Sequence, residues 1–243
     1  MILIKRLVSP ILTQAKQLVP RLCLFCDGPL AEQNSVCHYC LNDWRKHSEC
    51  LAWADILSMP GVKKTLNASA LAHIYCLNQH QQQVAALIRR FKYQQDLLAG
   101  SALIELMAYC HQEAFENAIF IPVPMHWLRR LYRGFNQANW LAEQLAKQYQ
   151  GQCLPLLKRT RYTQRQAGLE ALQRRKNLQD AFVLNKAAFV SMQWPKPVFL
   201  VDDVVTTGTT LNTLAQVLKA AGIEHVNAVT ISWSAAASVS RGY

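Results

Sequence analysis

Residues 198–210 limit the possible folds of this chain more than any other part of it. They begin with four apolar residues, continue with Asp202 and Asp203, and end in a loop of threonine and glycine that leads into a helical pattern. Four consecutive apolar residues are typical of a strand buried on both faces, as in a parallel sheet covered by helices. The stretch therefore predicts a strand–loop–helix unit with polar groups at the carboxyl end of a core strand.

Short apolar runs and longer helical patterns alternate from about residue 66 onward. We expect strands at residues 70–76, 118–123, 198–201 and 226–231, and helices at residues 84–92, 96–115, 137–148 and 211–221. This alternation is typical of an α/β fold with a mostly parallel, twisted sheet flanked by helices. The first part of the chain is instead rich in cysteine and turns. We therefore expect a small N-terminal module at residues 1–58 and the α/β domain at residues 59–243.

The composition fits a globular protein. Of 243 residues, 51% are hydrophobic and 17% charged, which excludes collagen-like and disordered chains. No uncharged apolar stretch reaches the roughly 20 residues of a membrane helix. Lys5 and Arg6 interrupt the apolar start, and no small-residue cleavage site follows it. We expect a cytoplasmic protein without membrane insertion.

The positive charge is concentrated in the middle of the chain. The formal net charge is +11, and residues 121–180 hold eleven Lys or Arg against Glu143, Glu170 and Asp180, a net +8. Such a basic region suits a polyanion, either a nucleic acid or a phosphate-rich small molecule. A solvated basic face without a ligand is the alternative.

The loop after the predicted core strand has the chemistry of a phosphate site. Its backbone N–H groups and the start of the next helix converge on one point, where an anion is stabilised. Its residues are Thr206, Thr207, Gly208, Thr209 and Thr210. Asp202 and Asp203 precede it, and carboxylates suit the hydroxyls of a sugar or a metal ion. A phosphorylated sugar fits this pattern, although an Asp-Asp pair alone can be a turn or a helix cap.

Further cations follow a second predicted strand. Arg129, Arg130 and Arg133 come after the Pro-Val-Pro sequence at residues 122–124, and Gly134 follows them, so this turn could hold a pyrophosphate. Lys92 ends a predicted helix and could also reach a phosphate, with an exposed helix-end lysine as the alternative. Residues 159–182 contain few apolar anchors and are expected to form a mobile arm. Four aromatic residues of this region could each stack on a base or pack in the core: Trp127, Tyr132, Phe135 and Tyr162.

Four of the eight cysteines form two pairs. Cys23 and Cys26 are followed by Cys37 and Cys40, so four thiolates can close a tetrahedron around Zn²⁺. A structural zinc would supply folding energy to a segment with little apolar content. A redox pair and plain buried thiols are the alternatives. Cys50, His38 and His47 are possible replacement ligands, and Cys76, Cys110 and Cys153 lie in apolar surroundings typical of a core.

Residues 198–210 resemble the signature of type I phosphoribosyltransferases, which binds phosphoribosyl pyrophosphate (PRPP). The resemblance extends to the ComF family, including its GntX branch, through Pro-Val-Pro at 122–124, Arg-Gly-Phe-Asn-Gln at 133–137, the Thr-x-x-Gln sequence at 163–166, and residues 174–182. It covers most of the chain, from Cys23 to about Ile231. The family is linked to DNA uptake in competent bacteria and, in some members, to use of external DNA as a nutrient.

The resemblance implies roles for the candidate residues. Asp202 and Asp203 would hold the ribose hydroxyls of PRPP, directly or through Mg²⁺, and residues 206–210 would hold its 5-phosphate. Arg133 and nearby basic residues would stabilise the departing pyrophosphate, which a nucleophile displaces from C1. Lys92 is a further candidate for binding PRPP. An acceptor pocket is not recognisable in the sequence.

Two functions are therefore expected. One is a Mg²⁺-dependent phosphoribosyltransferase acting on an unknown acceptor. The other is an accessory protein with little turnover that binds single-stranded DNA or a competence helicase, with PRPP as a regulatory ligand. The intact acidic pair and phosphate loop favour the first, and the zinc module and missing acceptor signature favour the second.

Overall fold

The computed structural model describes residues 21–30, 34–47, 50–80, 82–160, 181–185, 189 and 196–234. Its helices are α2 (His38–Lys46), α3 (Pro60–Lys63), α4 (Gln82–Tyr93), α5 (Leu97–Tyr109), α6 (Trp127–Arg133), α7 (Gln137–Gln148) and α10 (Thr209–Ala220), with 3-10 turns η1 (Ile56–Ser58) and η2 (Glu113–Phe115). Its strands are β1 (Cys50–Asp55), β2 (Ile74–Gln79), β3 (Ile119–Pro122), β4 (Gln152–Cys153), β5 (Leu157–Arg159), β6 (Phe182–Leu184), β7 (Val198–Val205) and β8 (Val226–Trp233).

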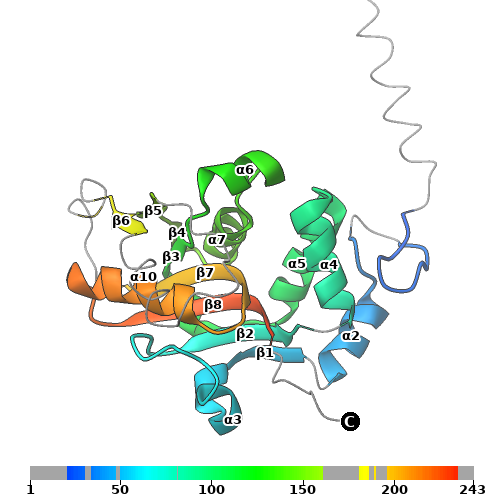
Figure 1. Cartoon of the computed structure of the whole chain (residues 1–243). Helices are drawn as coiled ribbons and strands as arrows, with labels where there is room; N and C mark the ends of the chain where they lie inside the picture. The colour runs from blue at the N-terminus through cyan, green and yellow to red at the C-terminus, as the bar shows by residue number, and fades with distance from the viewer. Residues whose placement is uncertain are drawn as a thin grey trace, which may run out of the picture.

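A six-stranded sheet organises these elements in the order β1-β2-β8-β7-β3-β4 (Figure 1). All neighbouring strands run parallel except β1, which is antiparallel to β2. Helices α4, α5 and α7 cover one face, and α10 covers the other. The expected α/β fold with a mostly parallel sheet flanked by helices is confirmed.

The two faces of the sheet can be read from alternating residues of its central strands. Phe199 and Val201 of β7 pack with α4, α5 and α7, whereas Val198 and Leu200 pack with α10. Successive side chains of a strand point to opposite faces, so an uninterrupted apolar run fills two cores at once. This is the physical reason for the continuous apolar pattern at the start of β7.

Three predicted elements have different limits in the structure. The first expected strand begins only at Ile74, because the backbone N–H of Ala70 donates to Asn212 Oδ1 of α10 (2.8 Å) instead of joining the sheet. The strand β7 continues through both aspartates to Val205. The expected helix at 96–115 ends at Tyr109, where the carbonyl of Cys110 accepts the Trp53 Nε1–H (2.6 Å).

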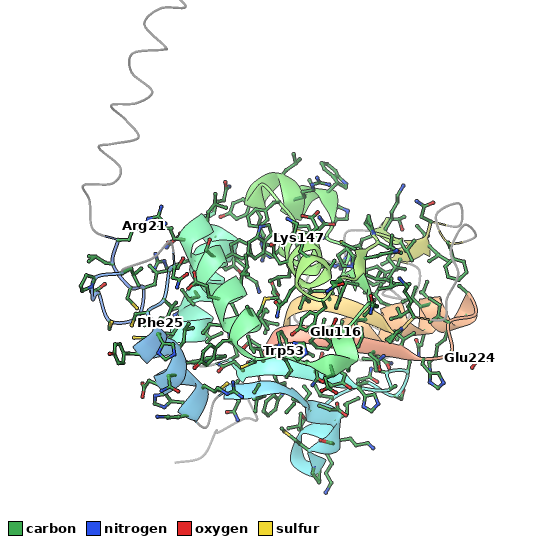
Figure 2. The ribbon with its side chains drawn as sticks, turned by 180° about the vertical axis from the view of Figure 1, so that it is seen from behind. Arg21, Phe25, Trp53, Glu116, Lys147 and Glu224 are labelled. Carbon is green, nitrogen blue, oxygen red and sulfur yellow. The ribbon has the colours of Figure 1, made fainter. Side chains whose placement is uncertain are left out.

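The cysteine-rich segment contacts the sheet closely. Its strand β1 forms the edge of the sheet, and the buried Trp53 of that strand meets Phe115 edge-on at 5.3 Å. Figure 2 shows Phe25 of this segment next to α2. Glu105 of α5 accepts the backbone N–H groups of Ser35 and Val36 at 2.7 and 2.9 Å. The division into residues 1–58 and 59–243 stays a prediction.

Strands β5 and β6 form a separate antiparallel pair. They stand at the two ends of the expected arm, whose residues 161–180 lie outside the described part of the chain. Within the described residues, no helix combines the length and the apolar character that crossing a membrane requires.

Candidate functional site

The carboxyl ends of β2, β8, β7 and β3 meet at one edge of the sheet because these strands are parallel. The registers pair Asn78 with Ser232 and Asp202 with Thr230, so the end of β2 and the acidic pair of β7 reach this edge on either side of β8. Open α/β sheets bind their ligands at such an edge. Residues far apart in the sequence are thereby brought to one place.

A cleft of about 360 Å³ lies at this edge. Of the residues predicted to bind PRPP, six line it: Lys92, Arg133, Asp202, Asp203, Thr206 and Thr210. Further polar residues on its wall are His80, Arg89, Arg129, Asn136, Gln137 and Arg159. Within the described part of the chain, five Lys or Arg thus face two carboxylates on this wall, a net positive charge suited to a multiply charged anion.

Lys92 and Asp203 form an ion pair inside the cleft. Lys92 Nζ of α4 lies 2.9 Å from Asp203 Oδ1, and the two side chains are only 15% and 14% exposed. Lys92 is therefore not an exposed helix-end lysine. Its ammonium group compensates one of two adjacent carboxylates, whose mutual repulsion would otherwise disfavour the ionised pair.

Asp202 is the unusual acid of the pair. Burial and the neighbouring Asp203 carboxylate raise the pKa of Asp202 to about 7, although Lys92 and the Asp203 backbone N–H, which donates to Asp202 Oδ1 (2.9 Å), act in the opposite direction. A carboxyl group that titrates near neutral pH in a cationic cleft is a typical functional-site feature. It can accept a ligand hydroxyl or a metal ion as it loses its proton.

The threonine loop has the geometry of an anion site. Gly208 has φ +70°, and a Cβ there would make a tight contact of 3.2 Å with the Asn67 carbonyl oxygen, so both the backbone conformation and the space favour glycine. The Asn67 N–H in turn donates to the Thr207 carbonyl at 2.8 Å. Among the described residues, no side chain caps the N-terminus of α10. The hydroxyl groups of Thr207 and Thr209 share a hydrogen bond of 3.1 Å. Thr207, Gly208 and Thr209 belong to the loop but do not line the cleft, unlike Thr206 and Thr210.

Arg133 of α6 also lines the cleft. Its guanidinium lies 5.0 Å from the centre of the Tyr93 ring and also donates to the Tyr93 hydroxyl at 3.3 Å. Arg133 is the last residue of α6, and Gly134 with φ +80° is its C-cap. Asn136 then caps the N-terminus of α7, where its side chain accepts the N–H of Ala138. The expected Arg-Gly-Phe-Asn-Gln turn is thus a helix–helix corner that aims a cation into the cleft.

Sequence reasoning did not assign Arg89 and His80 to the site. Arg89 lies three residues before Lys92 on α4, and this helical spacing puts both on one face. That signal was available. His80 follows β2, and only the sheet order brings it to the cleft.

A larger groove of about 750 Å³ adjoins the cleft and shares Pro124, Met125, Asn136 and Arg159 with it. Trp127 and Arg130 of α6 and Lys158 of β5 also line the groove. The side chain of Trp127 is 60% exposed, whereas Phe135 packs on Phe91 at 5.0 Å. Tyr132, also on α6, is 82% exposed but is not part of this groove. Packing therefore accounts for Phe135 but not for Trp127 or Tyr132, and Tyr162 lies outside the described residues.

The four paired cysteines cluster in a second candidate site. The sulfur atoms of Cys23, Cys26, Cys37 and Cys40 all lie within 4.8 Å of one another. Those of Cys26 and Cys37 are 3.9 Å apart, close to the edge of about 3.8 Å that a tetrahedron with 2.3 Å metal–sulfur bonds requires. The geometry and the all-thiol donor set therefore fit a metal ion such as zinc.

Backbone N–H groups support this cluster. Burial raises the pKa of Cys23, but the N–H groups of Cys37, Phe25 and Cys26 outweigh it and lower the pKa to about 7, which favours the thiolate that a metal needs. In the described part of the chain, the cluster includes neither Cys50 nor His38 nor His47. Cys76 and Cys110 are buried as expected, and Cys153 is half-buried against the core.

Three relatives show what this chain is similar to. Competence protein F of Haemophilus influenzae is 36% identical over 159 residues, which are 62% of this chain and 68% of that protein. DNA utilization protein YhgH of Escherichia coli K12 is 28% identical over 215 residues, 82% of this chain and 91% of the relative. Competence protein ComFC of Streptococcus pneumoniae is 24% identical over 215 residues, 86% of each chain.

No protein-family profile matches the chain. The likeness to the Haemophilus protein nevertheless extends over more than two thirds of that protein, and the other two relatives align with most of this chain. The chain therefore belongs to the ComF family.

Proposed function

We propose that the cleft binds PRPP together with Mg²⁺ and that the protein transfers phosphoribose to an acceptor with release of pyrophosphate. The observation that carries this proposal is the meeting of Asp202 and Asp203 with five cationic side chains beside the uncapped start of α10. PRPP combines a phosphate, vicinal hydroxyls and a pyrophosphate, and each part has a chemical counterpart in the cleft. The names of the relatives support a role in DNA uptake or use of external DNA.

The roles of the residues follow from the position of each. The 5-phosphate is placed at the start of α10, against the threonine loop, because N–H groups and the helix dipole stabilise an anion there. The ribose hydroxyls are placed on Asp202 and Asp203. Arg133 and Lys92 are placed on the pyrophosphate, with Arg129 next to them.

Departure of pyrophosphate from C1 leaves an oxocarbenium-like centre and a strongly negative leaving group. Fixed cations that already surround the cleft stabilise this leaving group without reorganisation. The carboxylates of Asp202 and Asp203 stabilise the positive ribose, and their oxygens are the ligand type that Mg²⁺ prefers. Asp202 and Asp203 would hold a Mg²⁺ ion bound together with PRPP, and such an ion would neutralise part of the charge of the pyrophosphate.

Zinc is proposed for the cysteine cluster as a structural ion. The four ligands leave no open position for substrate, as is typical of structural zinc sites. The hydrogen bonds from Ser35 and Val36 to Glu105 of α5 would transmit the order of the metal site to the helical layer beside the cleft.

Calorimetry with PRPP and Mg²⁺ tests the binding site. We expect the wild-type protein to bind and the double variant Asp202→Asn/Asp203→Asn to lose at least about tenfold in affinity, since hydroxyl and metal ligands are removed together. Asp43→Asn is the matched control, because Asp43 is 77% exposed on α2. Unchanged affinity in the double variant would refute the assignment. Pyrophosphate release with a panel of bases then tests for transfer.

The groove beside the cleft favours a second candidate function, an accessory protein that binds single-stranded DNA. Its exposed Trp127 can stack on a base while Arg130 and Lys158 contact phosphates. In that case affinity for a single strand falls steeply with salt, and Trp127→Ala weakens binding while PRPP affinity is unchanged. Binding that does not depend on salt or on Trp127 would exclude this candidate.

A further inference from the structure

Among the described residues that line the cleft, His80 is the one with an imidazole, and the roles described so far leave it unused. It follows β2 at the carboxyl edge of the sheet. Asp203, Lys92 and Arg89 are the charged groups that act on it, from β7 and α4. His80 therefore lies beside the ribose end of the proposed ligand, among groups that fix charge around it.

The position of the ring is fixed from β8. The backbone N–H of His80 donates to the Trp233 carbonyl at 2.7 Å, and Nδ1 shares a hydrogen bond of 2.9 Å with the hydroxyl of Ser232. Ser232 is fully buried. Since Nδ1 is engaged with β8, Nε2 is the ring nitrogen left for a ligand in the cleft.

The surroundings favour the neutral ring. Burial and the Lys92 cation, with a smaller contribution from Arg89, lower the pKa of His80, while the Asp203 carboxylate opposes them. A histidine with a lowered pKa is uncharged at neutral pH and can accept a proton. When the Nδ1 proton is donated to Ser232 Oγ, Nε2 carries the lone pair.

We propose that His80 is the general base of the transfer and that the acceptor is a neutral heterocycle with an N–H group. The acceptor N–H bond breaks, and its electron pair forms the new bond to C1. The C1–O bond breaks, and its electron pair leaves on pyrophosphate. The proton moves to Nε2 of His80 and then to solvent. This inference rests on the proposed function, because it requires PRPP in the cleft.

The acceptor class follows from this chemistry. An anionic acceptor has already lost its proton and would leave His80 without a role. A nucleophile that stays protonated after attack, such as an alkylamine, is itself a cation at neutral pH and is repelled by the five cations of the cleft. A neutral N–H heterocycle avoids both problems and loses its proton only as the bond to C1 forms.

The test compares His80→Gln with His225→Gln. His225 is exposed, and it follows the end of α10 at the opposite edge of the sheet. We expect both variants to bind PRPP and Mg²⁺ within about threefold of wild type by calorimetry, because a general base contributes to rate and not to phosphate binding. If the wild-type protein does not bind PRPP, the proposed function itself is refuted. This outcome is distinct from a wild-type protein that binds PRPP but does not use His80 as its general base.

Pyrophosphate release is then measured between pH 5.5 and 9 with water and with a panel of N–H heterocycles. We expect His80→Gln to lower kcat by about 10²–10⁴-fold and to lose part of the acid limb of the pH profile, whereas His225→Gln retains both. Asp202 also titrates near pH 7 but is intact in each variant, so its limb is common to all three proteins. Equal rates for His80→Gln and wild type would overturn the assignment. So would a wild-type protein that binds PRPP but releases no pyrophosphate with any acceptor.

The titration of the ring is observed directly by NMR. The His80 imidazole signal is the one absent from His80→Gln, and we expect its pKa to lie below the ordinary 6.5, with the proton of the neutral ring on Nδ1. A pKa of 6.5 or higher, or a neutral ring protonated on Nε2, would overturn the proposal regardless of the acceptor.

Discussion

Lys92 and Asp203, which both line the cleft, join helix α4 to the central strand β7 by an ion pair of 2.9 Å. The pair is largely shielded from solvent, and its cation compensates the repulsion between the consecutive carboxylates of Asp202 and Asp203 in the folded protein. Any ligand that takes a hydrogen bond from Lys92 or gives one to Asp203 meets groups already held in place, which reduces the entropy lost on binding.

Removal of the cation in this pair is the first prediction. Lys92→Met keeps the aliphatic stem but leaves Asp203 without its partner, so the free energy of unfolding should fall by roughly 1–3 kcal/mol. PRPP affinity should fall as well. Lys63→Met is the control, since Lys63 is exposed on α3. Urea unfolding measures the stability of both variants, and calorimetry measures their PRPP affinity. Equal stability of Lys92→Met and Lys63→Met would contradict the role of the ion pair.

The raised pKa of Asp202 gives the second prediction. With a pKa of about 7 in the folded state and about 3.8 in the unfolded state, the folded protein binds an additional proton between these values. The stability contributed by this proton is complete at low pH and is lost as pH rises through 7. Asp202→Asn removes the titration and should be more stable than wild type at pH 8 by on the order of 1 kcal/mol, with a smaller difference at pH 5.

Urea unfolding at pH 5 and pH 8 measures this difference, and parallel stability of the two proteins at both pH values would exclude it. A gain in stability of Asp202→Asn combined with loss of PRPP binding would be the usual trade-off between stability and function at a partly buried carboxylate.

The third prediction concerns Gly208 and Gly61. An alanine at position 208 must adopt φ +70° and bring its Cβ to 3.2 Å from the Asn67 carbonyl. Gly208→Ala should therefore lower the free energy of unfolding by about 1–3 kcal/mol and open the threonine loop. A Cβ at Gly61, on α3, meets nothing within 4 Å. Gly61→Ala should be neutral or slightly stabilising in thermal unfolding. If the two variants had the same stability, the threonine loop would not depend on glycine at position 208.

Metal content is the subject of the fourth prediction. The purified protein should contain about one zinc ion per chain, because the four thiols form one tetrahedral set. Cys26→Ser should lose the metal and lower the Tm by several degrees, as should a strong chelator. Cys153→Ser, a change at a half-buried thiol outside the cluster, should keep the zinc. Elemental analysis measures this directly, and zinc retained by Cys26→Ser would show that another group completes the site.

Local sequence was sufficient for elements whose signals lie within a few residues. The apolar run and threonine loop predicted strand β7 and the helix α10 that follows it, and the helical pattern at residues 137–148 predicted α7, because strand burial and helix periodicity depend on nearby residues. The spacing of the cysteine pairs likewise predicted the cluster of four thiols.

Strand β1 was not predicted because its local pattern is broken. Ala52 and Trp53 have φ +46° and +65°, and the pairing register with β2 shifts between Cys50 and Ala54. Non-glycine residues adopt such angles only when surrounding contacts hold them, as the burial of Trp53 against Phe115 does here. No pattern within the strand itself indicates this.

The sequence by itself determined the fold class, the cluster of the two cysteine pairs, and the strand–loop–helix unit that carries the acidic pair and the threonine loop. Only the tertiary structure decided that Lys92 would neutralise Asp203 and that His80 and Arg89 would face the same cleft. The physical reason is that capping, turn chemistry and burial patterns act between neighbours along the chain. The composition of the cleft depends instead on which strand ends and helices the sheet order brings together, and this order is set by long-range packing of both faces of the sheet.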